Sequence, residues 1–211
     1  MVVPESDAGT PLPVVLVFHG SGSSGQEIRA WYDIEAAADG GAIFVYPNAA
    51  RLRAWDLGPQ GGDFRMVQDV LERLGNEYCV DGTRIFATGM SAGAVFTLYV
   101  GCNAGSTFRA IGPIAGTEDR FDQSCCKQPV SAILIHGTAD TSIPYTEGTA
   151  ALGEILDRDE CSSSNVPDGP QCVQYSGCTA GREVDWCTHG GGHIVPDFAG
   201  TEVWRFFSQV P

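Results

Sequence analysis

The chain has 211 residues, of which 43% are hydrophobic, and a formal net charge of −14 at pH 7. This length and composition suit one folded domain with a full core, spanning residues 1–211, and exclude wholesale disorder. The negative charge disfavours nucleic acid and anionic membranes as partners, and no apolar run approaches the roughly 20 residues of a membrane span.

Residues 1–12 contain neither a charged n-region nor an apolar h-region, so no signal peptide is visible. The chain is therefore either cytosolic or has lost its signal. The eight cysteines favour the second reading, and we expect a secreted protein, extracellular or periplasmic, with disulfides. Buried free thiols in a cytosolic protein are the alternative. No pair has CxxC spacing, so structural zinc is disfavoured.

The pairing of the cysteines stays open, because eight cysteines allow about 105 connectivities. We favour Cys79 with Cys102, since these two flank a strand–serine–helix segment. Cys125 and Cys126 are adjacent, and we expect them to bond to different partners.

Strands and helices alternate along the predicted chain. Short apolar, β-branched runs predict strands buried on both faces, and apolar stripes predict helices. In chain order we expect a strand at 13–18, a helix at 26–39, a strand at 42–46, a helix capped by Asp63, a strand at 84–88, a helix at 92–101, strands at 110–115 and 132–135, a helix at 147–158, an irregular disulfide-tied segment at 159–182, a strand at 183–187 and a helix at 202–208. This alternation predicts an α/β fold, with a mostly parallel central sheet and helices on both faces.

Ser91 lies at the junction of a predicted strand and a predicted helix, within the sequence GMSAG at 89–93. A sharp strand-to-helix turn puts its central residue in a strained conformation, and small residues on either side let the backbones pass closely. The hydroxyl then projects at a helix N-terminus, where free N–H groups carry a partial positive charge. This context predicts a nucleophilic serine.

A serine hydroxyl needs a base, and in this architecture the chain order is serine, acid, histidine. That order leaves two histidines after the last predicted strand, His189 and His193. We favour His193, because the three glycines at 190–192 allow its ring to reach the serine. His189 is the alternative, and we expect His19 and His136 to be structural.

The acid should follow the serine and end a strand. We favour Asp140, on the loop after the predicted strand at 132–135, where its carboxylate would hold the imidazole tautomer and stabilise the imidazolium. Glu118, Asp119 and Asp122 are the alternatives, but they lie in a polar run typical of a solvated surface.

Two backbone N–H groups complete the predicted site as an oxyanion hole. Ala92 directly follows the serine, and Ser21 lies in the Gly-rich loop after the first strand. The glycines of that loop serve turn geometry alone in the competing interpretation.

Four segments together resemble the secreted α/β-hydrolase esterases of carbohydrate esterase family one, a group with feruloyl esterases, acetylxylan esterases and poly(3-hydroxybutyrate) depolymerase-like proteins. They are HGSGSSG at 19–25, YCVDGTRIFATGMSAGA at 78–94, IHGTADTSIPY at 135–145 and GGGHIVPDF at 190–198. The likeness runs from about residue 12 to the C-terminus. It implies the triad Ser91, Asp140 and His193, with Ser21 and Ala92 as the oxyanion hole. Val195 departs from the family pattern, in which many members carry Trp.

The resemblance implies a single α/β-hydrolase catalytic domain and a serine carboxylic-ester hydrolase that works through an acyl-enzyme, with no cofactor and no metal. We expect a feruloyl- or acetylxylan-type esterase that acts on plant cell-wall esters, small or polymeric, with no obligate protein partner. A polyester hydrolase similar to poly(3-hydroxybutyrate) depolymerase is the main alternative. A peptidase or acyltransferase with the same triad, or a non-catalytic binding module on the same fold, are the others.

The length of the chain leaves no room for a substantial lid, which predicts an open, shallow site. Trp55 stacks on a phenolic or sugar ring in one interpretation and only fills a loop in the other. We expect Trp31, Trp186 and Trp204 in the core.

Overall fold

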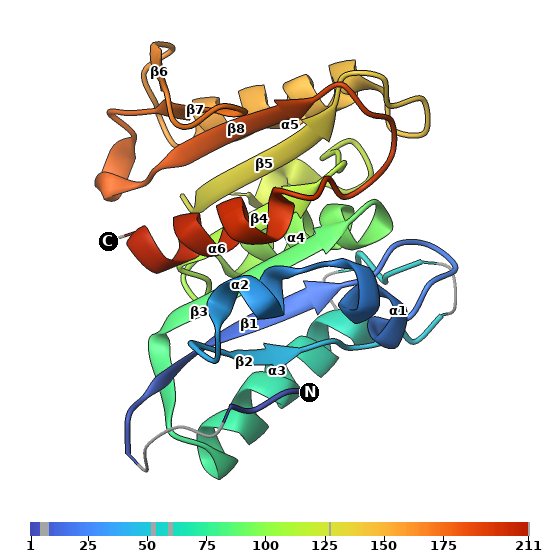
Figure 1. The fold of residues 1–211 in the computed structure, drawn as a ribbon, viewed down its shortest axis with the longest axis vertical. Helices are drawn as coiled ribbons and strands as arrows, with labels where there is room; N and C mark the ends of the chain where they lie inside the picture. The colour runs from blue at the N-terminus through green and yellow to red at the C-terminus, as the bar shows by residue number, and fades with distance from the viewer. Residues whose placement is uncertain (5–8, 52–53, 59–60, 127, 211) are drawn as a thin grey trace.

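The computed structural model describes residues 1–4, 9–51, 54–58, 61–126 and 128–210 (Figure 1). Its centre is an eight-stranded sheet with the order β2-β1-β3-β4-β5-β8-β7-β6. Six strands are parallel, and β6 and β7 add an antiparallel hairpin at one edge. The strands are β1 (Leu12–Phe18), β2 (Ile43–Val45), β3 (Val80–Met90), β4 (Ala110–Ile114), β5 (Ser131–Gly137), β6 (Asn165–Pro167), β7 (Cys172–Tyr175) and β8 (Val184–His189). The predicted α/β fold with a mostly parallel sheet is confirmed.

Helices cover both faces of the sheet (Figure 1). One layer holds α1 (Gly25–Trp31), α2 (Ile34–Ala38) and α6 (Ala199–Gln209), and the other holds α3 (Gly62–Glu77), α4 (Ala92–Ala104) and α5 (Tyr145–Arg158). Apart from the short 3-10 helices η1 (Gln123–Cys125) and η2 (Thr179–Gly181), every helix and strand of the described residues belongs to the sheet or these layers. The absence of a substantial lid stays a prediction.

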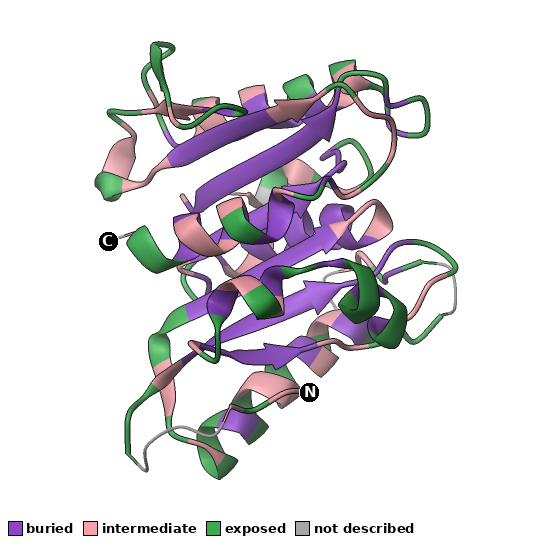
Figure 2. Cartoon of the chain, in the orientation of Figure 1, coloured by how far each residue is buried: buried purple, intermediate pink, exposed green. Residues whose placement is uncertain are grey.

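Strand β1 shows why the central strands are apolar without alternation. Val15 and Val17 pack into the core beneath α1, α2 and α6, whereas Leu16 and Phe18 pack into the core beneath α3, α4 and α5. Since side chains point to opposite faces in turn, a strand covered on both faces is apolar at every position. The buried strands form the interior of the molecule in Figure 2.

Helix α4 lies directly behind Ser91 and is buried all round. Its residues 93–102 are all buried, which fits a helix with apolar residues on every side. It packs on β3, β4 and β1, and a disulfide from Cys102 to Cys126 joins its C-terminal half to the segment after η1. The helix is therefore a rigid support for whatever its N-terminus presents.

Two of the predicted helix boundaries are wrong. The helix expected at 26–39 is two helices, α1 and α2, because the chain leaves the helical conformation at Tyr32 and buries that ring, with its hydroxyl 3.1 Å from Thr88 Oγ1. Asp63 does not cap α3, whose N-cap is Gly61. The Asp63 carboxylate is buried and accepts hydrogen bonds from the N–H groups of Ala50 and Asp56, both at 2.8 Å. Buried loop amides need such an acceptor more than the helix end does.

The segment expected to be irregular, 159–182, contains the β6–β7 hairpin and the disulfide Cys161–Cys178, and the disulfide Cys172–Cys187 joins it to β8. The predicted disulfide character is thus confirmed, with three bridges among the described residues, as is typical of proteins from oxidising compartments. This bonding is consistent with an extracellular protein.

The favoured pair Cys79–Cys102 is wrong, since Cys102 bonds to Cys126 and Cys79 is free and exposed. A strand advances about 3.3 Å per residue and a helix only about 1.5 Å. Helix α4 therefore runs back along only about half of β3 before it reaches Cys102, while Cys79 lies beyond the far end of β3. The side chain of Cys125 lies outside the described part of the structure, so the separate pairing of Cys125 and Cys126 stays a prediction.

The tryptophans divide differently from the prediction. Trp186 is in the core as expected, and Trp204 is partly buried against Phe44. Trp31 is 45% exposed, contrary to the prediction, because α1 ends there and the neighbouring Tyr32 takes the buried position.

Among the helices of the described residues, none combines the length and apolar character that crossing a bilayer requires.

An ion pair that is about 30% exposed joins the edge hairpin to α6. Asp185 of β8 is fully buried beside Asp168 of the hairpin turn, and the Arg205 guanidinium of α6 lies 2.5 Å from the carboxylate of Asp168 and 3.5 Å from that of Asp185. Burial, together with the neighbouring Asp168 carboxyl, raises the pKa of Asp185 to about 7 despite the charge of Arg205.

This carboxyl predicts a pH dependence of stability. Because its pKa is higher in the folded state than the unfolded value of about 4, its contribution is complete below about pH 4 and is lost as the pH rises through about 7. We expect this group to lower the free energy of unfolding by roughly 2–4 kcal/mol between pH 4 and pH 8, and Asp185→Asn to lack that component. Urea unfolding of the oxidised protein at several pH values measures it. The control is Asp69→Asn, which changes an exposed carboxylate on α3; equal pH slopes for all three proteins would contradict the assignment.

Candidate active site

Ser91 occupies a strained turn between β3 and α4. Its backbone has φ 58° and ψ −121°, a conformation that non-glycine residues rarely adopt. The turn is held by hydrogen bonds from Ser91 N–H to the Ile114 carbonyl and from Val95 N–H to the Ser91 carbonyl, both of 3.0 Å. The predicted strand-to-helix turn at this serine is therefore present.

The glycines on either side of Ser91 are required by the close passage of β1. A Cβ atom on Gly89 would lie 2.6 Å from the Phe18 carbonyl oxygen, and one on Gly93 would approach that same oxygen even more closely. Real Cβ atoms do not tolerate such contacts, so both positions exclude a side chain. The absence of side chains lets α4 begin directly against the end of β1.

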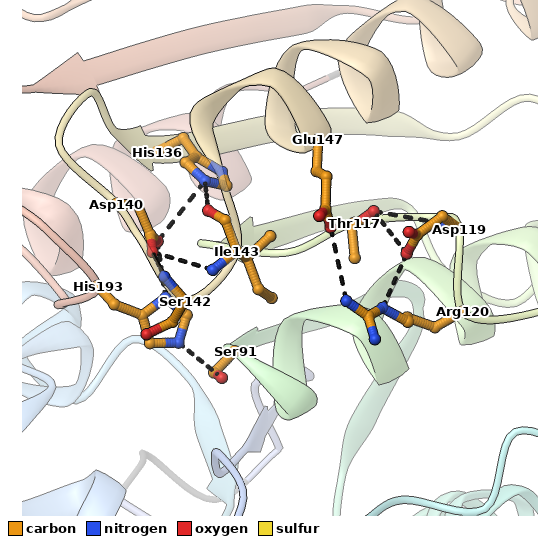
Figure 3. A network of polar contacts seen from close by, with 10 residues as sticks. All are labelled: Ser91, Thr117, Asp119, Arg120, His136, Asp140, Ser142, Ile143, Glu147 and His193. Atoms are coloured by element: carbon orange, nitrogen blue, oxygen red, sulfur yellow. Dashed lines mark hydrogen bonds and ion pairs between the residues drawn. The ribbon is translucent and has the colours of Figure 1, made fainter.

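The predicted trio converges at the carboxyl ends of the parallel strands (Figure 3). His193, on the connection between β8 and α6, has Nε2 at 2.8 Å from Ser91 Oγ and Nδ1 at 2.6 Å from Asp140 Oδ2. The Asp140 side chain is fully buried on the β5–α5 loop, and the His193 side chain is 20% exposed. Three segments far apart in sequence thus form one continuous chain of hydrogen bonds.

The surroundings of Asp140 keep its carboxyl ionised. Burial by itself would raise the pKa of Asp140, but hydrogen bonds from His193 and from the backbone N–H groups of Ile143 and Ser142 outweigh it and lower this pKa below its usual value. The two backbone bonds reach Oδ1, at 2.8 Å from Ser142 and 3.0 Å from Ile143, which leaves Oδ2 for the imidazole. A carboxylate held this way orients the ring and stabilises a positive charge on it.

The remaining histidines have structural contacts. The buried His136 has Nε2 at 2.9 Å from the Ile143 carbonyl. This contact fixes the loop that carries Asp140. His19 is buried too, and its Nε2 accepts from Ala49 N–H at 3.2 Å. The alternative base, His189, accepts from Gly191 N–H at 3.1 Å and so shapes the glycine run before His193.

The alternative acids lie apart from the trio. Asp119 is exposed and paired with Arg120, and Asp122 is exposed and caps η1. Glu118 is not on a solvated surface as predicted: it is buried with Arg158 at 3.4 Å, and burial raises its pKa to about 6 in spite of that arginine. Glu118 can be buried within a polar run because Arg158, which is distant in sequence on α5, is its partner.

The backbone groups expected to form the oxyanion hole lie next to Ser91. A Cβ atom on Gly20 would be only 3.4 Å from Ser91 Cβ, so the loop after β1 passes beside the serine. Ala92 is the first residue of α4, where N–H groups have no carbonyl partner within the helix. Ser21, Ser91 and Ala92 all line one cavity.

This cavity has a volume of about 310 Å³. A larger cavity, about 520 Å³, lies between α2 and the N-terminal residues but contains none of the trio, so we place the chemistry in the smaller one. The smaller cavity is lined by Ser21, Ala54, Trp55, Leu57, Ser91, Ala92, Val95, Arg120 and Ile143. Of these, the sequence analysis missed Ala54, Leu57, Val95, Arg120 and Ile143; only Val95, one helical turn after the serine, carried a signal that spacing could have used.

Trp55 is part of the core as well as of the cavity wall. It is 5% exposed, its Nε1–H donates to the His19 carbonyl at 2.9 Å, and its ring stacks on Phe96 at 4.7 Å between centroids. One face of the indole is thereby covered, so a substrate ring has at most the rest of the indole to contact.

Comparison with known proteins identifies relatives that are named as esterases. No family model matches the chain. The chain is 26% identical to a probable feruloyl esterase C of Aspergillus niger over 95% of the chain and 79% of the relative, and 29% identical to a probable feruloyl esterase C of Aspergillus terreus over 88% and 71%. Among solved structures, an acetyl xylan esterase from Aspergillus awamori superimposes with a TM-score of 0.80 at 17% identity, over 98% of this chain and 92% of that one.

The fold and the site together define a serine carboxylic-ester hydrolase with the α/β-hydrolase fold. The resemblance to the secreted esterases of carbohydrate esterase family one, drawn from the four sequence segments, is confirmed by these relatives.

The close approach at Gly93 makes a stability prediction. Gly93→Ala places a methyl group against the Phe18 carbonyl, and we expect a loss of at least about 1–3 kcal/mol in the free energy of unfolding, since neither backbone can retreat. Gly75→Ala is the matched control: this helical glycine on α3 has open space around it, and we expect a gain of about 0.5–1 kcal/mol. Denaturant unfolding measures both. Equal effects of the two substitutions would show that the turn at Ser91 is not tightly packed against β1.

Proposed function

We propose that the protein hydrolyses carboxylic esters of plant cell-wall polysaccharides, as a feruloyl- or acetylxylan-type esterase, and that residues 1–211 work as one catalytic domain. The observation that carries this proposal is the hydrogen-bonded chain Ser91–His193–Asp140, whose serine lines a cavity. The relatives, which are named as feruloyl esterases and an acetyl xylan esterase, support the substrate class.

Acylation begins when Ser91 Oγ attacks the ester carbonyl. His193 Nε2, 2.8 Å away, takes the hydroxyl proton, and the ionised Asp140 stabilises the imidazolium that results. The N–H groups of Ser21 and Ala92 donate to the oxyanion of the tetrahedral intermediate. The intermediate collapses when His193 returns the proton to the departing alcohol, which leaves the acyl group on Ser91.

Deacylation repeats these steps with water as the nucleophile. His193 removes a proton from water, the hydroxide adds to the acyl carbonyl, and the same two N–H groups stabilise the second oxyanion. Collapse returns the proton to Ser91 and releases the carboxylic acid. No step requires a metal or a cofactor.

We further propose that the protein is secreted. The three disulfides among the described residues are stable in an oxidising compartment, and an extracellular location gives access to polymeric esters. The net charge of −14 opposes binding to nucleic acid or anionic membranes, and the mechanism uses groups of one chain only.

The nucleophile is tested by Ser91→Ala. We expect this variant to stay folded. Its kcat for p-nitrophenyl acetate should fall by about 10⁴- to 10⁶-fold, because the acyl-enzyme cannot form. The matched control, Ser106→Ala, removes an exposed hydroxyl after α4 and should leave the rate unchanged. Labelling by a fluorophosphonate should follow the same pattern. Full activity of Ser91→Ala would remove the serine from the mechanism, and no labelling of the wild type would favour a binding module.

The substrate class is tested by a panel of esters. We expect release of ferulate from methyl ferulate or of acetate from acetylated xylan, because the open, shallow site that the sequence predicts would admit polysaccharide-bound esters. Chromatography of the released acids measures both. Clearing of a polyhydroxybutyrate film without either release would reject the cell-wall assignment in favour of a polyester hydrolase.

A further inference from the structure

We propose that Arg120 determines the acyl specificity of the site: its guanidinium donates a hydrogen bond to a neutral oxygen substituent on the ring of an aromatic acyl group. The inference rests on the proposed esterase function and adds to it the kind of acid that the cavity selects. Arg120 follows β4, far in sequence from the catalytic loops, and it is the one charged residue among the described residues that line the cavity of Ser91.

The cavity wall between Ser91 and Arg120 is mostly apolar. Apart from Arg120, the lining residues beyond the serine and the predicted oxyanion hole are Ala54, Trp55, Leu57, Val95 and Ile143. An aliphatic acetyl group would leave most of this apolar wall uncovered, whereas an aryl ring would cover it. Figure 3 shows Ser91 and Arg120 set apart from each other, with the guanidinium on the side of Arg120 that faces Ser91. An acyl group attached to Ser91 can therefore extend along the apolar wall toward the guanidinium.

Two carboxylates lie beside the guanidinium of Arg120, whose side chain is 55% exposed. Nε lies 2.9 Å from Asp119 Oδ1, and Nη2 lies 3.7 Å from Glu147 Oε2 on α5. Nη1 has no partner within the described residues, so it can donate to a ligand. The planar fork of the guanidinium can direct this donor toward an oxygen atom of the ligand.

The same carboxylates determine the charge of the preferred ligand. Asp119 and Glu147 more than neutralise Arg120, and a neighbouring hollow of about 300 Å³ is lined by Glu118 and Glu154 as well. An anionic substituent would meet this negative surplus, while a hydroxyl or methoxy oxygen needs only the N–H donor. The selected acids are thus hydroxy- and methoxy-substituted aryl or arylacrylic acids.

The test compares esters that share one alcohol and differ in the ring substituent. Methyl cinnamate has no ring oxygen, methyl p-coumarate and methyl ferulate have one or two, and methyl 4-carboxycinnamate carries an anion. We expect the wild type to prefer the oxygenated neutral esters, and Arg120→Ala to lower kcat/KM for them by about 10- to 100-fold while methyl cinnamate and p-nitrophenyl acetate change little. Arg120→Lys should recover part of the loss. Arg73→Ala, at an exposed arginine paired with Glu77 on α3, is the matched control and should change nothing.

A second variant tests the charge argument. Glu147→Gln removes one carboxylate beside the guanidinium, so we expect the kcat/KM of methyl 4-carboxycinnamate to rise relative to that of methyl ferulate. An unchanged ratio would reject the selection against anions.

Two further substrates, p-nitrophenyl benzoate and p-nitrophenyl 4-methoxybenzoate, separate a failure of this inference from a failure of the proposed function. If hydroxycinnamates and xylan are inert but the 4-methoxybenzoate preference disappears in Arg120→Ala, the proposed substrate class fails and the role of Arg120 stands. If Arg120→Ala lowers all esters equally, or lowers none, the role of Arg120 is overturned while the esterase function is unaffected. If the wild type hydrolyses no ester of any series, both fail.

Discussion

The site depends on one steric constraint, the contact between the start of α4 and the end of β1. The end of β3 and the start of α4 come so close to the Phe18 carbonyl that Gly89 and Gly93 cannot carry side chains, and Ser91 makes the turn between them at positive φ. The strain at Ser91 is maintained because α4 is buried on every side and cannot retreat. The hydroxyl, the N-terminus of α4 and the loop after β1 are brought together by this single contact.

Around that turn, buried polar groups fix the carboxylate of Asp140. His136 bonds the Ile143 carbonyl while Ile143 N–H bonds Asp140, so the short loop after β5 is held from both sides. The consequence is electrostatic as well as geometric: Asp140 stays ionised in spite of its burial and can balance a charged imidazole. A buried carboxylate without such donors would take up a proton and lose this role.

Charge in this protein acts locally rather than through the net excess of acid. One arginine between two carboxylates, Arg120, borders the cavity, and another, Arg205, joins the edge hairpin to α6 through Asp168. The contacts of Arg120 with Glu147 and of Arg205 with Asp168 join elements distant in sequence. Carboxylates that outnumber the cation have different effects in the two places, since burial leaves Asp185 with a raised pKa whereas the partly exposed Arg120 keeps a free donor.

The sequence by itself determined the α/β fold and the trio, because strand and helix periods, the glycines beside Ser91 and the order serine, acid, histidine are local signals. Parallel strands bring their carboxyl ends to one edge, so residues that end strands meet without further information. Only the tertiary structure decided which cysteines pair, that Asp63 and Glu118 are buried, and that Arg120 and Ile143 reach the cavity. These depend on the different lengths covered by strands and helices and on side chains from distant elements, which no local pattern encodes.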